Sequence, residues 1–211
     1  CGMPKLELGD LEAVAEHKAA NMPVLARYAR EGYAILSAVP SCTLMFKQEL
    51  PLMFPDDPDV QKVKAAFYDP FEYLMLRHKE GKLRTDFKQP LGKVAYQAAC
   101  HQRVQNIGPK TKEVLSLIPD TTVDMIERCS GHGGIWGART ENFDIAVKVG
   151  KPAAQAALKN DTSYVASECP LAAEHLLQVM EMTAGDAPPK PKRADHPIEI
   201  LARAYGLVSG E

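Results

Sequence analysis

Short apolar runs alternate with longer amphipathic stretches along this chain of 211 residues. Runs rich in β-branched and aromatic residues predict buried strands at 33–39, 93–99, 121–126 and 164–166. After each run, apolar residues recur at helical spacing. Strands that alternate with helices favour the α/β class, here a mainly parallel sheet with helices on both faces.

Capping signals and apolar spacing locate the helices. Asp10 is the expected N-cap of the first helix, and Pro23 suits the first turn of a second helix that ends at Arg30. Further helices are expected shortly after Cys42 and over 60–80, 112–118, 138–159, 170–182 and 198–205. Glycine and proline at 150–152 predict a break in the helix over 138–159, and the proline- and lysine-rich tract 184–197 predicts a surface loop or linker.

The two halves of the chain share a faint repeat. When the Cys-Gly pair at 1–2 is aligned with the Ser-Gly pair at 130–131, a proline follows 22 residues after the first residue in both halves. A cysteine then follows 41 residues after the start of one half and 39 after the start of the other. A duplicated half-domain gives such a pattern, so we expect the remainder of one repeat in 1–59 and a second repeat in 60–211.

Composition and charge argue against several classes of protein. A net charge of −2 provides no basic face for nucleic acid, and aromatic residues make up only 7% of the chain. No apolar run approaches the ~20 residues of a membrane-spanning helix. Five cysteines without a close pair do not suit a secreted disulfide framework, so we expect a reducing, cytoplasmic location. The start at Cys1-Gly2, without an initiator methionine, suggests a piece of a longer protein.

Cysteines follow the predicted strands. Cys42, Cys100, Cys129 and Cys169 each lie at the end of an apolar run. The carboxyl ends of parallel strands gather at one edge of a sheet, where ligands bind. Thiolates are the usual ligands of iron–sulfur clusters and of structural zinc. The sequence therefore predicts a metal or iron–sulfur centre at this edge.

Histidine and glycine residues accompany these cysteines. His101 and His132 lie beside Cys100 and Cys129, and each is a candidate for a fourth ligand or for a hydrogen-bond donor to sulfur. Glycines in the loop 129–137 allow sharp turns and can direct N–H groups at sulfur. This loop resembles a dinucleotide-binding loop in composition only, because it lacks the G-x-G-x-x-G spacing.

The same residues suit two other chemistries. Three cysteines and a histidine can hold a structural zinc ion. A thiol enzyme would use Cys129 as its nucleophile and His132 as its base, with Asp124 or Glu127 orienting the imidazole. That interpretation leaves the other strand-end cysteines without a role.

Taken together, the motifs resemble a known family. VPSC, AYQAACHQRVQNIG, ERCSGHGGIWG and ASECPLAAEHL resemble the cysteine-rich CCG domain. That domain occurs twice in the B subunit of heterodisulfide reductase, in the iron–sulfur subunits of glycolate and lactate oxidases, and in the C subunit of anaerobic glycerol-3-phosphate dehydrogenase. The tail HPIEILARAYGL looks like the closing segment of the last of these.

The resemblance implies an electron-transfer role in an oxidoreductase complex. It implies a cluster, 4Fe–4S by expectation, on Cys100, Cys129 and Cys169, with Cys1 and Cys42 as the remains of a second site. It further implies a flavin dehydrogenase subunit or another redox partner, an acceptor such as a quinone, and a ferredoxin-like segment upstream. A peripheral position at the inner membrane would then come from the partners, with no span in this chain.

The chain departs from the family pattern at several cysteine positions. The pattern is one cysteine, then Cys-Cys-Gly, then Cys-x-x-Cys. In the first repeat Cys42 takes the first position of the last motif and Met45 stands at the second. In the second repeat Ser130 and Ala172 replace two cysteines. The remaining three, with one of the two neighbouring histidines, are expected to hold an ordinary 4Fe–4S cluster or a zinc ion.

Overall fold

The computed structural model describes residues 1–159, 161–185, 189, 191 and 193–208. The chain forms two compact units, and each is considered by itself. The first comprises Cys1–Tyr73 with His101–Ile107, and the second comprises Leu74–Cys100 with Gly108–Glu211. The predicted division into repeats at residue 59 stays a prediction.

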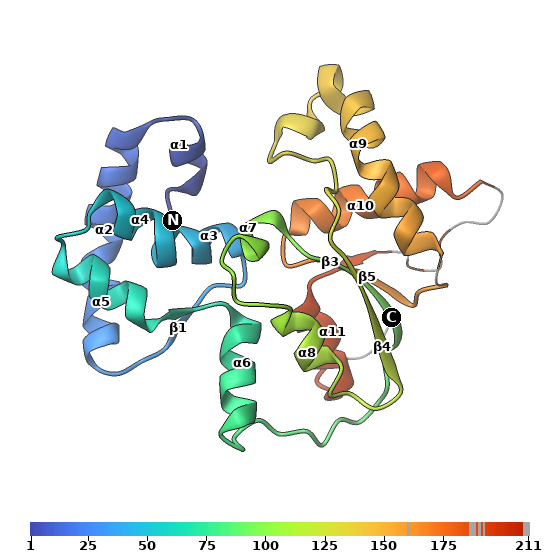
Figure 1. Cartoon of the computed structure of the whole chain (residues 1–211), viewed down its shortest axis with the longest axis horizontal. Coiled ribbons are helices and arrows are strands. Elements are labelled where there is room, and N and C mark those ends of the chain that lie inside the picture. The colour runs from blue at the N-terminus through green and yellow to red at the C-terminus, as the bar shows by residue number, and fades with distance from the viewer. Residues whose placement is uncertain (160, 186–188, 190, 192, 209–211) are drawn as a thin grey trace. The chain divides into compact units, whose positions relative to one another are not determined.

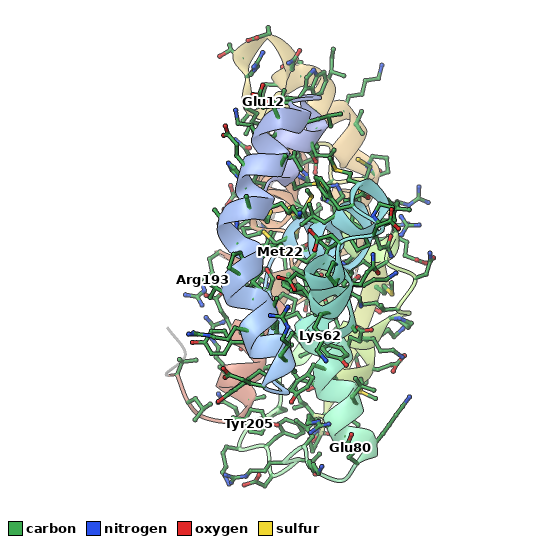
Figure 2. The ribbon with its side chains drawn as sticks, turned by 90° about the vertical axis from the view of Figure 1, so that its left-hand side faces the viewer. Glu12, Met22, Lys62, Glu80, Arg193 and Tyr205 are labelled. Atoms are coloured by element: carbon green, nitrogen blue, oxygen red, sulfur yellow. The ribbon has the colours of Figure 1, made fainter. Side chains whose placement is uncertain are left out.

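The first unit is mainly helical (Figure 1). Its elements are α1 Met3–Glu7, α2 Leu11–Arg30, β1 Ile35–Leu36, α3 Pro40–Leu44, a π-helical segment Met45–Glu49, α4 Leu50–Met53, α5 Pro58–Ala66 and β2 Phe67–Tyr68. Helix α6, Pro70–Lys79, begins in this unit. As predicted, Asp10 caps α2, and its carboxylate accepts the Ala13 N–H at 3.1 Å. Figure 2 shows α2 alongside α5, and Met22 of α2 is part of the buried core.

The strand predicted at 33–39 is shorter and less buried than expected. The strand β1 comprises Ile35–Leu36 alone within this run, and it pairs in parallel with Phe67–Tyr68 of β2. Leu36 is 46% exposed and Tyr33 is 58% exposed. The apolar run therefore does not form the buried strand that its composition predicts.

The second unit contains a parallel sheet in the order β4-β3-β5-β6. Its elements are β3 Gly92–Gln97, α7 Cys100–Arg103, α8 Lys110–Leu115, β4 Thr121–Ile126, a 3₁₀ turn Trp136–Ala138, α9 Thr140–Leu158, β5 Tyr164–Ala166, α10 Pro170–Thr183, β6 Ala194–Asp195 and α11 Pro197–Ala204. Helix α7 begins here and continues in the first unit. β4, β5 and the start of α10 agree with the sequence prediction.

Helices cover both faces of this sheet, which confirms the predicted α/β class. Apolar residues of α9 and α10 pack on Ala95 of β3 and Val165 of β5. The next residue along β3, Tyr96, points to the opposite face, where α8 and α11 lie (Figure 1). The chain leaving β3 thus returns through α8 on one face, while β5 leads into α10 on the other. Neighbouring strands whose connections diverge in this way create the crevice where ligands bind in such sheets.

The helix breaks predicted at Pro23 and Pro152 are both wrong. The two prolines occupy equivalent positions in the two halves of the repeat. Pro23 lies inside α2, and Pro152 lies inside α9. Both prolines are exposed, so the hydrogen bond that each removes lies on the solvent side of its helix. Buried residues follow both of them in the helix, Ala26 in α2 and Ala153 in α9, so core packing continues through each proline.

The structure extends the repeat beyond the residues that suggested it. Gly2 and Gly131 adopt φ values of +94° and +95°. A long helix, a short strand and a helix that starts with proline follow in each half, as α2, β1 and α3 and as α9, β5 and α10. The halves also correspond further on, where a second strand leads into another proline-initiated helix, β2 into α6 and β6 into α11.

Reciprocal capping closes the repeat in both halves. Asp69 accepts the N–H groups of Phe71 and Glu72, and Glu72 accepts the Asp69 N–H at 3.2 Å. His196 and Glu199 exchange equivalent bonds at the start of α11. The sequences DPFE and HPIE each place a glutamate three residues after the capping residue, which is the spacing of a capping box.

The tract 184–197 is not simply a loop. Ala194–Asp195 forms β6 and pairs with β5, while residues 186–188, 190 and 192 lie outside the described part of the chain. Arg203 of α11 reaches Asp195 at 3.0 Å and ties the closing helix to this strand. Within the described segments, no helix combines the length and apolar character needed to cross a membrane.

The Asp69 cap allows a stability prediction. Asp69→Ala is expected to lower the free energy of unfolding by about 1 kcal/mol, because it leaves helix N–H groups without an acceptor. Asp69→Asn keeps an acceptor oxygen and is the matched control. Urea denaturation of the full chain measures both, and equal stability of the two variants would contradict the capping role.

The same residue predicts a pH dependence. Burial raises the pKa of the Asp69 carboxyl above its ordinary value. The folded chain therefore holds this proton more tightly than the unfolded chain, and stability from Asp69 falls as the pH rises through the raised pKa. The stability of the wild type relative to Asp69→Asn should decrease as the pH rises from the ordinary pKa of an aspartate, about 4, through the raised pKa of Asp69. A constant difference would show that burial does not perturb this group.

Candidate metal centre

Three of the predicted cysteines lie at one edge of the second unit's sheet. Cys129 follows β4, Cys100 follows β3, and Cys169 follows β5 as the N-cap of α10. β3 pairs in parallel with both other strands, so these three carboxyl ends are neighbours although they are far apart in sequence. Cys100 and Cys129 are exposed, and Cys169 is half-buried.

His132 lies against Cys169. Its Nε2 is 3.7 Å from the Cys169 sulfur, and its Nδ1 is hydrogen-bonded to the Ser130 hydroxyl at 2.8 Å. Ser130, which stands where the family has a cysteine, thus fixes the orientation of the imidazole. The thiol enzyme interpretation placed His132 beside Cys129 with an acidic residue behind it. The structure places Nε2 of His132 against Cys169, and the thiol enzyme interpretation stays a prediction.

The loop that carries Cys129 is pressed onto helix α9. Gly131 and Gly150 approach so closely that a Cβ on Gly131 would lie 2.1 Å from the carbonyl oxygen of Ala146. A Cβ on Gly150 would lie 2.3 Å from the carbonyl oxygen of Ser130. These glycines allow the loop to pack closely on α9. The Gly131 N–H also points at the Cys129 sulfur at 3.4 Å, as predicted for a loop that supports a thiolate.

Opposing effects act on the Cys169 thiol. Burial raises its pKa, and the charge of Cys100 and Glu168 raises it further. Backbone N–H groups of Leu171 and Ala172 at the start of α10 act in the opposite direction.

The burial of Cys169 predicts a difference in reactivity. In the metal-free chain, iodoacetamide should alkylate Cys169 more slowly than Cys100 or Cys129, because Cys169 is half-buried and burial raises the pKa of its thiol. Peptide mass spectrometry over time measures the three rates. Fastest alkylation at Cys169 would instead indicate a nucleophile activated by His132.

A buried carboxylate precedes Cys169. Glu168 is 1% exposed and accepts hydrogen bonds from the Tyr96 hydroxyl, at 2.8 and 3.0 Å, and from the Thr111 hydroxyl. These contacts join the end of β5 to β3 and α8. Sequence reasoning missed this group, although a glutamate lies two residues after the apolar run 164–166.

A pocket of about 630 Å³ adjoins the site between α10 and the glycine loop. His132 lines it together with Phe143, Leu171 and His175. His175 is 8% exposed and stacks edge-on against Phe143. The pocket leaves the His132 side of the centre open to solvent.

The other predicted ligands belong to the first unit. Cys1 packs against that unit's core. Cys42 lies within α3, two residues after Pro40, whereas Cys169 directly precedes Pro170. Because both prolines start their helices, the structure aligns Cys42 with Ala172, so Cys42 corresponds to the second cysteine of Cys-x-x-Cys and not to the first.

His101 also falls in the first unit, although Cys100 before it is assigned to the second. Its Nε2 lies 3.6 Å from the Glu7 carboxylate. His132, by contrast, belongs to the second unit and contacts the Cys169 sulfur there.

The donors at the sheet edge are three thiols, with the His132 imidazole beside one of them. Zinc draws its donors to about 2.0–2.3 Å, so four ligands of a preformed site would crowd together. In the described part of the chain, no three His, Cys, Asp or Glu side chains form a group that could hold one metal ion. The thiolates of a cluster bind separate iron atoms and lie farther apart. The role of the three thiols as ligands stays a prediction.

Comparison with known proteins gives a distant relation. No family model matches the chain. The B subunit of the fumarate reductase (CoM/CoB) of Methanothermobacter marburgensis is 26% identical to this chain. The alignment is 212 residues long and covers 97% of the chain. The match covers 38% of that protein, so the chain spans well under half of its relative's length. The chain is thus a distant homologue of a subunit of a redox enzyme.

Proposed function

We propose that the second unit is an electron-transfer module that holds an iron–sulfur cluster on Cys100, Cys129 and Cys169. The observation that carries this proposal is the convergence of three thiols at the ends of β4, β3 and β5. The resemblance to the CCG domain and the homology to a reductase subunit support it. When bound, the cluster would accept and release single electrons.

Backbone N–H groups face two of the three candidate ligand sulfurs. The Gly131 N–H faces the Cys129 sulfur, and the first N–H groups of α10 lie at Cys169. Such donors stabilise thiolates and tune the potential of a cluster. His132, held by Ser130 beside Cys169, is our candidate for the fourth ligand of a 4Fe–4S cluster. The rim of the adjacent pocket would give a partner access to this side.

The complex around this module is also a proposal. Electrons would enter from a dehydrogenase subunit with a flavin, or from a ferredoxin-like segment of a longer chain. They would leave to an acceptor of the quinone class or to another redox partner. A subunit of a larger reductase fits this position.

Anaerobic purification tests the proposal. The chain should be brown, contain iron and acid-labile sulfide in comparable amounts, and give an EPR signal on reduction. Zinc alone, with unfolding on its removal, would support the structural zinc alternative. Colourless protein without iron after reconstitution would contradict the electron-transfer function.

A further inference from the structure

Gln97 lies where the three cysteine-bearing strand ends meet. It is the last residue of β3, it is 1% exposed, and no charged group accompanies it in the apolar stretch VAYQAA. We propose that Gln97 is a positioning residue that fixes the three cysteine loops relative to one another. This inference rests on the proposed function of those cysteines.

The amide nitrogen of Gln97 binds two of the strand ends. Nε2 donates to the Ala98 carbonyl at 3.0 Å and to the Arg128 carbonyl at 3.0 Å. Ala98 lies two residues before Cys100, and Arg128 directly precedes Cys129. Both N–H donors of the amide are therefore used, one at the end of β3 and the other at the end of β4.

The amide oxygen of Gln97 binds the third strand end. Oε1 accepts from the Ser167 hydroxyl at 3.0 Å, and that hydroxyl in turn accepts the Cys169 backbone N–H at 3.3 Å. Ser167 is fully buried. Because two carbonyl groups can only accept hydrogen bonds, the NH₂ group must face them and the oxygen must face Ser167. A continuous chain of hydrogen bonds thus runs from Arg128 through Gln97 and Ser167 to Cys169.

This arrangement needs the length and both functions of a glutamine. An apolar residue of similar size would leave the Arg128 carbonyl and the Ser167 hydroxyl without their partner, at a cost of about 1–3 kcal/mol. A loss of stability of this size is expected for any buried polar group that loses its hydrogen-bond partner. What sets Gln97 apart is that each bond ends within two residues of a different thiol, so its loss should separate the thiols as well as reduce stability.

The test uses two variants and a matched control in the full chain. Gln97→Met removes all three bonds, and Ser167→Ala removes only the connection to Cys169. Thr121→Val is the control, because Thr121 accepts the Leu91 N–H at 3.0 Å at the opposite end of the same sheet. Thr121→Val loses a hydrogen bond far from the cysteines. The variant therefore shows the effect of destabilisation without displacement of the thiols.

Two readouts separate positioning from stability. In the metal-free chain, bifunctional maleimides of graded length measure which pairs of thiols can be bridged. Gln97→Met should reduce bridging of Cys100 to both Cys129 and Cys169, and Ser167→Ala only to Cys169. After reconstitution, Gln97→Met should lose iron to a chelator about tenfold faster than the wild type and shift the reduction potential. Thr121→Val should leave bridging, iron loss and potential unchanged.

The outcomes distinguish this inference from the function on which it rests. If the wild type holds no iron, the electron-transfer proposal fails, and the bridging pattern alone decides whether Gln97 positions the thiols. If Gln97→Met and Ser167→Ala bridge their thiols like Thr121→Val, the positioning role is overturned. Should Gln97→Met fail to fold, the selective effect expected for Ser167→Ala decides in the same way.

Discussion

Gly131→Ala is expected to lower the free energy of unfolding by about 3 kcal/mol, combining backbone strain with overpacking. The new methyl group would lie 2.1 Å from the Ala146 carbonyl oxygen and 2.9 Å from the Gly150 nitrogen. Both are backbone atoms of α9 and cannot turn away as the end of a side chain could. The φ value of +95° is itself unfavourable for a residue with a Cβ. Urea denaturation of the full chain measures the loss.

Two further glycines make this prediction specific. Gly134 has a φ value of +63°, and no atom lies within 4 Å of an added Cβ, so Gly134→Ala should cost only about 1 kcal/mol. Gly150→Ala should also be destabilising, although alanine inside a helix is ordinarily better than glycine by about 1 kcal/mol. Equal costs at 131 and 134, or a gain at 150, would contradict the close contact between the cysteine loop and α9.

The strands of the second unit could be predicted from short apolar runs in the sequence. β4 and β5 occupy the predicted residues: Val165 and Ala166 of β5 are buried, and β4, at the edge of the sheet, buries Val123 and Ile126. The run at 33–39 has the same composition but forms only the two-residue strand β1. Apolar character alone does not say whether partner strands and covering helices are present, and β1 pairs with the equally short β2.

Local rules failed where packing decides. A proline ordinarily ends a helix, yet α2 and α9 continue through Pro23 and Pro152, because the prolines face solvent while the opposite faces stay in the core. The alignment of Cys42 within the repeat also depends on packed structure, because the start of its helix decides which residue of the second half it matches. Counting residues from the start of each half aligned it with Cys169, whereas the helix-initiating Pro40 places it further along, at the position of Ala172.

The cysteines of the site could be predicted, but not the polar residues that hold them. Strand-end thiols follow from strand positions and from the geometry of a parallel sheet. Gln97 and Glu168 act through partners that are distant in sequence, and nothing in their neighbouring residues indicates those partners. Their functions depend on which strand ends are neighbours, which the order β4-β3-β5 sets.

Serine substitution of the second-unit cysteines is expected to have the largest effect on function. Cys100→Ser, Cys129→Ser and Cys169→Ser should each remove nearly all iron from anaerobically purified chain, because a cluster with three cysteine ligands cannot tolerate the loss of one. Iron and sulfide analysis with EPR measures this loss. Circular dichroism should show an unchanged fold for the exposed Cys100 and Cys129, whose side chains do little packing.

The first unit supplies the matched controls for this series. Cys42→Ser makes the same chemical change in the other unit and should leave iron content unchanged, as should His101→Ala, whose imidazole pairs with Glu7. His132→Ala should instead lower iron content or alter the EPR spectrum, because this imidazole lies against Cys169. Loss of iron in Cys42→Ser equal to that in Cys129→Ser would show that ligands come from both units. The centre would then have to be assigned to the repeat pair as a whole, and the placement of a complete site at the ends of β4, β3 and β5 would be wrong.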